Sequence, residues 1–159
     1  MKKTNLFYLV LVTMLLLADQ LSKHYVLTKL FFLKPVYITP FFNLFLVYNK
    51  GAAFSFLSFA GGWQLLFFII VTVLIAVILI IYLFKDIHWL YKLSFAFALG
   101  GALGNLYDRI SYGYVIDFLQ VHIKDYYWPT FNIADSAITT GAILLFLLLI
   151  NKIPFKSNT

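Results

Sequence analysis

The sequence contains neither cysteine nor glutamate, and these two absences exclude several classes of protein chemistry. Without cysteine the chain can form no disulfide and offers no thiolate as nucleophile or metal ligand. Without glutamate it lacks the HExxH motif of zinc proteases, which uses a glutamate as general base. The six acidic residues are all aspartates: Asp19, Asp86, Asp108, Asp117, Asp125 and Asp135.

Charge of either sign is also scarce. Only 11% of the 159 residues are charged and 63% are hydrophobic, whereas a soluble domain carries about a quarter charged residues. A chain of this size has too much surface for its volume to hide so much apolar area from water, so lipid must surround much of it. The length allows one domain, residues 1–159. A formal net charge of +6 suits anionic lipid headgroups, and the scattered basic residues argue against nucleic-acid binding.

Long apolar runs predict an all-α membrane protein, a bundle of four transmembrane helices. The clearest run, residues 63–84, is long enough to cross a hydrocarbon core of about 30 Å, whereas the apolar run after Asp135 is short for the membrane at roughly 22 Å. In the third run, Ala96, Gly100 and Gly104 recur every fourth residue, a pattern that lets a neighbouring helix approach closely. The predicted spans cover residues 5–27, 63–84, 90–106 and 136–151.

The first run allows two interpretations. A basic start followed by the apolar residues 6–18 is typical of a secretory signal peptide. However, no A-x-A cleavage pattern follows, and a mature chain beginning near Asp19 would start inside a helical pattern. We therefore expect the first helix to stay attached, with Asp19 and Lys23 on one face because they lie four residues apart.

Residues 28–62 form the longest stretch without a span. Residues 36–39 and 43–48 have β character, and 49–54 predict a turn because asparagine and glycine tolerate conformations that other residues avoid. The stretch is too aromatic for a solvated loop. We expect a small extracytoplasmic β-sheet and a short amphipathic helix at the bilayer surface, with aromatic residues between Phe41 and Phe59 facing lipid or a lipid-like ligand.

Four spans place both termini on one side, but lysine and arginine counts do not decide which side. Six lie on each side of the predicted membrane. The basic residues on the terminal side lie closer to the span ends, and the N-terminus has the basic start of a signal anchor. We therefore expect cytoplasmic termini and an outer location for five of the six aspartates.

Two polar stretches flank the last two spans. Asn105 and Arg109 share one face at the end of the third span, and Asp117 follows a turn-like stretch at residues 111–114. Asp135 begins the fourth span, where it could simply cap the helix, although a carboxylate drawn to the edge of the hydrocarbon is usually functional. Two carboxylates that share one site can share a proton and hydrolyse a peptide bond.

Several residues keep alternative interpretations. Arg109 could bind a lipid phosphate or form an internal ion pair with Asp108 or Asp19. Asp117 could be an ordinary loop charge, although large apolar residues flank it. The three histidines are isolated, lack the spacing of metal ligands, and are interpreted as structural or interfacial: His24, His88 and His122.

Five motifs, in this order around four spans, give the chain a specific resemblance to a known family. The motifs are Asp19-Gln20-x-x-Lys23, Asn49-x-Gly51-Ala52-Ala53-Phe54, Gly101-Ala102-x-Gly104-Asn105-x-x-Asp108-Arg109, Gly113-x-Val115-x-Asp117-Phe118 and Phe131-Asn132-x-Ala134-Asp135-Ser136. They resemble those of lipoprotein signal peptidase (signal peptidase II), a bacterial membrane aspartic protease.

The resemblance implies that Asp117 and Asp135 are the catalytic pair and that no metal or cofactor is needed. It implies a substrate, a diacylglyceryl-modified prolipoprotein cut just before its lipidated cysteine, and an outward-facing site in the bacterial inner membrane. We expect a monomer in contact with membrane phospholipids. The residues implied to surround the pair or the substrate are Asp19, Lys23, Asn49, Gly51, Asn105, Arg109, Asn132 and Ala134.

Two functions of other classes remain open from the sequence. A non-enzymatic lipid-binding or transport protein would use Arg109 and Lys23 to grip a phosphate headgroup. A structural subunit of a membrane complex would use the glycine-spaced third helix to bind a partner. Which of the two aspartates acts as base and which as acid also stays open, because a coupled pair titrates as a unit.

Overall fold

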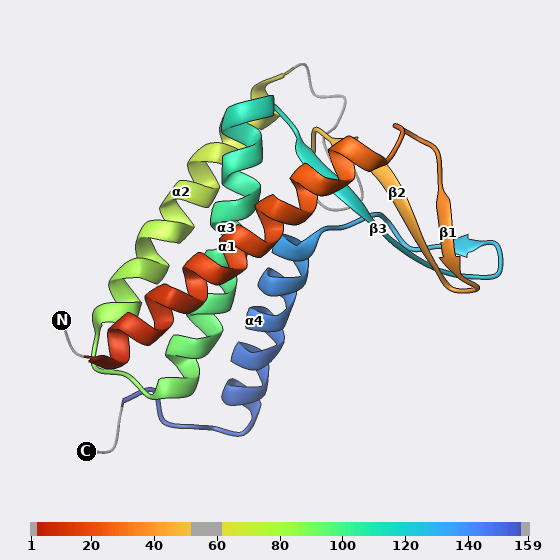
Figure 1. The fold of residues 1–159 in the computed structure, drawn as a ribbon. Coiled ribbons are helices and arrows are strands. Elements are labelled where there is room, and N and C mark those ends of the chain that lie inside the picture. Colours follow the sequence, from red (N-terminus) through yellow and green to blue (C-terminus); the bar gives the residue numbers. More distant parts are fainter. Residues whose placement is uncertain (1–2, 52–61, 157–159) are drawn as a thin grey trace.

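The computed structural model describes residues 3–51 and 62–156, which form four helices beside a small sheet (Figure 1). Both termini lie at one end of the helical bundle, and the sheet extends from the other end. The helices are α1 (Lys3–Lys29), α2 (Trp63–Phe84), α3 (Trp89–Tyr112) and α4 (Ile133–Ile150).

Three of the described helices are long and apolar enough to cross a membrane: α1 from Asn5, α2 and α4. Most of the surface of α2 is exposed, including the side chains of Leu66, Ile70 and Leu74. A helix that is apolar on all sides and packed on only one side is stable in lipid rather than in water. The bounds of α2 coincide with the predicted residues 63–84.

Helix α3 is the central helix, because it packs against α1, α2 and α4. Its polar side chains are satisfied inside the bundle. Lys92 Nζ donates a hydrogen bond to Asn5 Oδ1 at 3.1 Å, and Ser94 Oγ donates one to the Gly141 carbonyl oxygen at 3.0 Å. A buried polar group is tolerated only with such partners, so these contacts fix how α3 sits against its neighbours.

Small residues let α3 approach two helices at once, as the four-residue spacing predicts. A Cβ built on Gly100 would lie 2.8 Å from Leu15 Cβ of α1, and one on Gly104 would lie 2.6 Å from an Asp19 carboxylate oxygen. On another face of α3, Gly101 lies against the backbone carbonyl of Ala134. These glycines thus hold the start of α4 and the end of α1 against α3.

The substitution Gly101→Ala is expected to destabilise the protein by about 1–3 kcal/mol, because its methyl group would collide with the rigid Ala134 carbonyl. Alanine favours a helix more than glycine does, so a loss can be assigned to the collision. Chemical unfolding in detergent micelles measures the change. Ala142→Val, which adds bulk at an exposed position of α4, is the control and should unfold like the unchanged protein.

The sheet is antiparallel in the order β1-β2-β3-β4. Its strands are β1 (Val36–Thr39), β2 (Phe42–Asn49), β3 (Val115–Ile123) and β4 (Tyr126–Tyr127). The two predicted β segments are confirmed as β1 and β2. The sequence analysis missed β3, because its first four residues are all buried and therefore lack the alternation of a half-exposed strand.

An apolar cluster fastens the sheet to the bundle. It joins Val26 of α1 to Leu46 of β2 and to Ile116 and Phe118 of β3. Pairing of β2 with β3 brings Asn49 opposite Val115 and Val47 opposite Asp117. The predicted short amphipathic helix, the motif at residues 52–54, and Phe54, Phe56 and Phe59 lie outside the described residues.

Near the polar stretches, two helices extend beyond the predicted membrane spans, and one of them takes in the first half of the predicted turn. Helix α3 continues six residues past the predicted span and ends only where Gly113 adopts a φ of 78°, so residues 111 and 112 are helical rather than part of a turn. Helix α4 begins at Ile133, earlier than the predicted 136, because the Asn132 side chain caps it. Both shifts bring polar side chains onto rigid helical backbone.

Candidate active site

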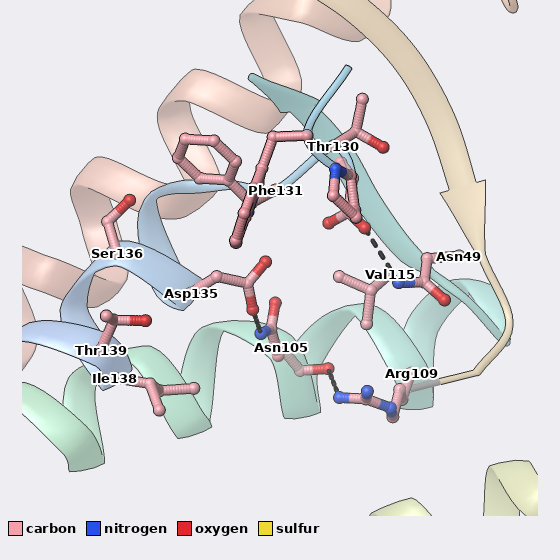
Figure 2. A pocket seen from close by; sticks show the side chains of 13 residues that line it. Asn49, Asn105, Arg109, Val115, Thr130, Phe131, Asp135, Ser136, Ile138 and Thr139 are labelled. Carbon is pink, nitrogen blue, oxygen red and sulfur yellow. Dashed lines mark hydrogen bonds between the residues drawn. The ribbon is translucent and has the colours of Figure 1, made fainter. Parts of the chain in front are cut away.

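A cavity of about 640 Å³ lies where the sheet meets the ends of α3 and α4 (Figure 2). Its walls combine polar groups with apolar side chains. In Figure 2, Asp135 of α4, Asn105 and Arg109 of α3, and Asn49 of β2 gather around it. The lining residues are Asn49, Asn105, Arg109, Val115, Asp117, Trp128, Pro129, Thr130, Phe131, Asp135, Ser136, Ile138 and Thr139.

Asp117 comes to this cavity from β3, and only 2% of its surface is exposed. Asn49 Nδ2 donates a hydrogen bond to one carboxylate oxygen at 3.0 Å, and Asn132 Nδ2 donates one to the other at 2.8 Å. The Gly51 amide donates to Asn49 Oδ1 at 2.9 Å, which turns the Asn49 amino group toward Asp117. Asp117 is therefore an oriented buried carboxyl group and not a solvated loop charge.

Asp135 comes from the first turn of α4, where it takes part in a capping box. The backbone N–H of Asp135 donates to Asn132 Oδ1 at 2.8 Å, and Asp135 Oδ2 accepts from the backbone N–H of Asn132 at 3.2 Å. The capping interpretation of Asp135 is thus confirmed, yet it leaves Oδ1 for another role. Asn105 Nδ2 of α3 donates to this Oδ1 at 2.7 Å.

Two asparagines connect the two carboxylates. Asn132 Nδ2, which contacts Asp117, also donates to Asn105 Oδ1 at 3.1 Å, and Asn105 Nδ2 contacts Asp135. The backbone N–H of Asp135 binds the side-chain oxygen of Asn132, so the side-chain amino group of Asn132 must point toward Asp117 and Asn105. The structure thus brings residues 18 positions apart in sequence, on β3 and α4, to one hydrogen-bonded network.

The environment of Asp117 favours its protonated form. Burial raises its pKa most, and repulsion from the Asp135 carboxylate raises it further, to about 7. Hydrogen bonds from Asn49 and Asn132 and the charge of Lys23 act in the opposite direction. Near neutral pH this pair of carboxyl groups therefore holds a proton that an ordinary pair of aspartates would have lost.

A second buried cluster lies beneath the carboxylate pair. Lys23 Nζ contacts Asp19 Oδ2 at 2.7 Å and Asp108 Oδ2 at 2.8 Å, and all three side chains are at most 1% exposed. The same Nζ donates to Asn105 Oδ1 at 3.2 Å. Since Lys23 can only donate, it forces the Asn105 amino group to point toward Asp135.

This cluster also holds backbone from two other segments. Asp19 Oδ1 accepts from the Ala134 amide at 2.9 Å, in the first turn of α4, and Asp108 Oδ2 accepts from the Ile116 amide at 3.0 Å, next to Asp117. Gln20 Nε2 bridges Asp19 and Asp108 at 3.1 and 3.0 Å. The ion cluster therefore positions both segments that carry the cavity carboxylates.

Arg109 does not form the ion pairs that the sequence analysis considered. Among the described residues, Asp19 and Asp108 both pair with Lys23. Asp19 lies one turn before Lys23 on α1, and Asp108 lies opposite it on α3. Arg109 instead donates to the carbonyl oxygens of Asn105 and Gly51 and stacks over the Phe68 ring at 5.3 Å. It lines the cavity as a cation beside two carboxylates.

All ten residues singled out from the sequence belong to this connected region, either at the cavity or in the cluster below it. Sequence reasoning missed the role of Asp108, which it considered only as a partner of Arg109. It also missed Gln20 and the 128–130 segment. A usable signal existed for Asp108: it lies four residues after Gly104, on the face of α3 that meets Asp19.

The arrangement supplies what acid–base hydrolysis of a peptide needs. One carboxylate can take a proton from water while a protonated partner polarises a carbonyl and then gives its proton to the leaving amine. The apolar walls, among them Val115, Phe131 and Ile138, limit the access of bulk water and so strengthen the electrostatic interactions of the pair.

Comparisons with known proteins agree with one another. Residues 11–151 match a family model described as signal peptidase (SPase) II. A lipoprotein signal peptidase of Dichelobacter nodosus is 49% identical over 146 residues, covering 91% of this chain and 94% of the relative. One of Alteromonas mediterranea is 45% identical over 148 residues, covering 92% of this chain and 81% of the relative.

Solved structures of bacterial membrane enzymes have the same fold. One is matched with a TM-score of 0.82 at 29% sequence identity, over 96% of this chain and 93% of the other. A second is matched with a TM-score of 0.78 at 32% identity, over 90% and 92% of the two chains.

Proposed function

The chain belongs to the signal peptidase II family and is a bacterial membrane protease that removes the signal peptide from prolipoproteins, and we propose that it does so by an aspartic mechanism with Asp117 and Asp135 as the catalytic pair. One observation supports this proposal most. Carboxylates from β3 and α4 line one cavity and are joined through the amides of Asn105 and Asn132.

In the proposed reaction, the ionised carboxylate takes a proton from water as the water oxygen attacks the scissile carbonyl carbon. The protonated partner stabilises the developing oxyanion. The C–N bond then breaks, and a carboxyl group gives its proton to the amine of the departing cysteine. Because the two groups titrate as a pair, the mechanism needs one proton on the pair rather than a fixed acid and a fixed base.

The remaining residues of the site have supporting roles in this proposal. Asn105, Asn132 and Asn49 orient the carboxylates, and Gly51 orients Asn49. Asp19, Lys23 and the Ala134 amide hold the start of α4. Arg109 lies in the cavity wall, where its charge suits an ester or phosphate oxygen near the lipid end of the substrate.

The arrangement in the membrane is part of the proposal. We infer a single membrane domain in which α3 is a fourth span. Before its polar end, which begins at Asn105, α3 has 16 residues, 89–104, and these make about 24 Å of helix. Termini in the cytoplasm and the site at the outer face of the inner membrane agree with the opposite locations of termini and sheet (Figure 1). The sheet would then cradle the substrate beside the phospholipid surface.

The substrate class has a direct test. Purified protein is incubated with a diacylglyceryl-modified prolipoprotein and with its unlipidated twin, and products are separated by mass. We expect cleavage of the first only, before the lipidated cysteine, by a monomer in detergent, since one chain supplies every residue of the site. Equal cleavage of both would contradict the lipid requirement, and binding of phospholipid without cleavage of either would favour a lipid-binding protein.

The rate of prolipoprotein cleavage should fall as the pH rises above about 7. Below that value the pair holds the proton that the leaving amine needs, and above it Asp117 ionises and the proton is lost. We expect kcat/KM to decline about tenfold per pH unit on this limb. In Asn49→Ala the limb should move to higher pH, because this variant removes a hydrogen bond that stabilises the ionised form of Asp117. A profile that stays level up to pH 9 would contradict the assignment.

A further inference from the structure

A second cavity, of about 360 Å³, adjoins the first at Asp117 and extends along the sheet instead of into the bundle. Asp117 and Asn49 line both cavities, whereas Asp135 lines only the first. The second cavity has its own side chains from β2, β3 and β4, namely Val47, Gln120 and Tyr127. A chain that passes the carboxylate pair can therefore continue into this cavity on the far side of Asp117 from α4.

The 128–130 segment is the shared wall of the two cavities. It is pinned to β3 at both ends: the Trp128 amide donates to the Val121 carbonyl oxygen at 2.8 Å, and Phe131 and Leu119 exchange hydrogen bonds at 2.8 and 3.0 Å. Pro129 and Thr130 lie between these two anchors and line both cavities. The 128–130 segment is thus held against the sheet by backbone hydrogen bonds on both sides.

Two residues that line the second cavity, Gln120 and Tyr127, are held in place by neighbouring side chains. Asn43 Nδ2 donates to Gln120 Oε1 at 3.4 Å, which leaves the Gln120 amino group as the donor available to a ligand. Tyr127 stacks on His122 with ring centroids 4.9 Å apart and pairs with it in the sheet. The cavity therefore presents an amide donor, a threonine hydroxyl and an aromatic wall, a set suited to a peptide backbone.

The proposed reaction indicates which part of a substrate could bind in the second cavity. A peptide cut at the carboxylate pair has an apolar signal helix on one side of the scissile bond and the mature, outward-leading polypeptide on the other. The first cavity borders α4 through Ser136, Ile138 and Thr139. In the part of the chain that the structure describes, the second is lined only by residues of the strands and of the 128–130 segment, and by none of a helix.

We propose that the second cavity binds the residues of the mature polypeptide that directly follow the lipidated cysteine, with the Gln120 amino group donating to their backbone carbonyl. This subsite rests on the proposed function and gives it a specificity on the product side. Backbone recognition accepts many sequences, and a volume of about 360 Å³ has room for side chains of different size beside Tyr127 and Val47.

The test uses three lipidated peptides that are identical up to the cysteine. One ends at the cysteine as an amide, one continues with glycine and serine, and one continues with tryptophan and serine. For the unchanged enzyme we expect kcat/KM to be highest for the glycine–serine peptide and about fivefold lower for the truncated one, the effect of one or two hydrogen bonds. The tryptophan peptide should be cut at a rate close to that of the glycine–serine peptide, because its backbone offers the same carbonyl.

Two variants locate the effect. Gln120→Leu should lower kcat/KM for the glycine–serine peptide about fivefold and leave the truncated peptide unchanged. Val47→Phe, which narrows the cavity, should slow both extended peptides and spare the truncated one. Val121→Thr is the control, since this exposed residue of β3 lines neither cavity, and it should behave as the unchanged enzyme.

The outcomes separate the two proposals. If the unchanged enzyme cuts all three peptides equally, the subsite is wrong and the proposed function stands. If Gln120→Leu or Val47→Phe slows the truncated peptide as much as the extended ones, the effect is a general one on the fold and the subsite is again overturned. If the unchanged enzyme cuts none of the peptides, the proposed function falls and the subsite falls with it.

Discussion

Asp117→Asn and Asp135→Asn are each expected to lower kcat/KM for a lipidated prolipoprotein by a factor of about a thousand or more while the protein still folds into the membrane. An amide has the shape of a carboxyl group but can neither take a proton from water nor give one to an amine. Positioned acid–base groups contribute about 10²–10⁴ in rate, and the two act as a unit, so losing either removes the effect of both.

The fold should survive both changes, because an asparagine at either position keeps an oxygen that accepts from Asn132 or Asn105. Asp125→Asn is the matched control: this exposed aspartate lies between β3 and β4 and lines neither cavity. Cleavage is followed by mass, and folding by the unfolding midpoint in micelles. Near-normal turnover by either dyad variant would show that the catalytic pair has been assigned wrongly.

Lys23→Met is expected to have the largest effect on stability, a loss of about 3–5 kcal/mol in the free energy of unfolding. The ammonium group lies between Asp19 and Asp108, both fully buried, at 2.7 and 2.8 Å. Methionine fills a similar volume but leaves two carboxylates facing each other without a cation. Removing one partner from a buried ion cluster costs far more than the net contribution of the pair.

Two further variants separate charge from packing. Lys29→Met changes the same residue type on an exposed turn of α1 and should alter stability by less than about 0.5 kcal/mol. Adding Asp19→Asn and Asp108→Asn to Lys23→Met removes the unpaired charges and should recover most of the lost stability, measured by chemical unfolding in micelles. A triple variant as unstable as Lys23→Met alone would mean that the lysine stem, and not its charge, stabilises the bundle.

The triple variant should nevertheless be a poor enzyme, since Lys23 also fixes the amide of Asn105, whose amino group contacts Asp135. Without the ammonium donor, the Asn105 amide can rotate and present its oxygen to the carboxylate. Stability and orientation of the site are thus two separate consequences of one buried cation.

The sequence predicted the elements whose signals are local. Residues 63–84 are almost entirely apolar and coincide with α2, and the β character of 36–39 and 43–48 corresponds to β1 and β2. The spacing of Gly100 and Gly104 correctly predicted close helix packing. Each of these signals depends on side-chain type within a few neighbouring positions, which is what a single sequence displays.

Features that depend on distant partners were not predictable in the same way. The first four residues of β3 lack the alternation of a half-exposed strand, and β2 pairs with them from about 70 residues away. The i,i+4 spacing predicted that Asp19 and Lys23 share a face, but the third member, Asp108, arrives only when α3 docks. One alternative left open for Arg109 was an ion pair with Asp108 or Asp19, and the structure gives both of these carboxylates to Lys23.

Asp135 illustrates why a capping interpretation and a functional one need not exclude each other. Its Oδ2 closes the capping box with Asn132, while Oδ1 faces Asn105 in the cavity. The local pattern revealed the first contact and the family motifs implied the second. Only the packed structure gives both to different oxygens of one side chain.

The long sequence separation of β2 and β3 determines how late in its synthesis a chain can become active. Because a ribosome releases the polypeptide from its N-terminus, β2 emerges long before β3, which follows only after α2 and α3. Until then neither proposed proteolytic carboxylate exists in the nascent chain, and Asn49 has nothing to orient. A ribosome stalled before residue 115 would therefore carry an inert precursor, so the bacterium gains no protease from unfinished copies.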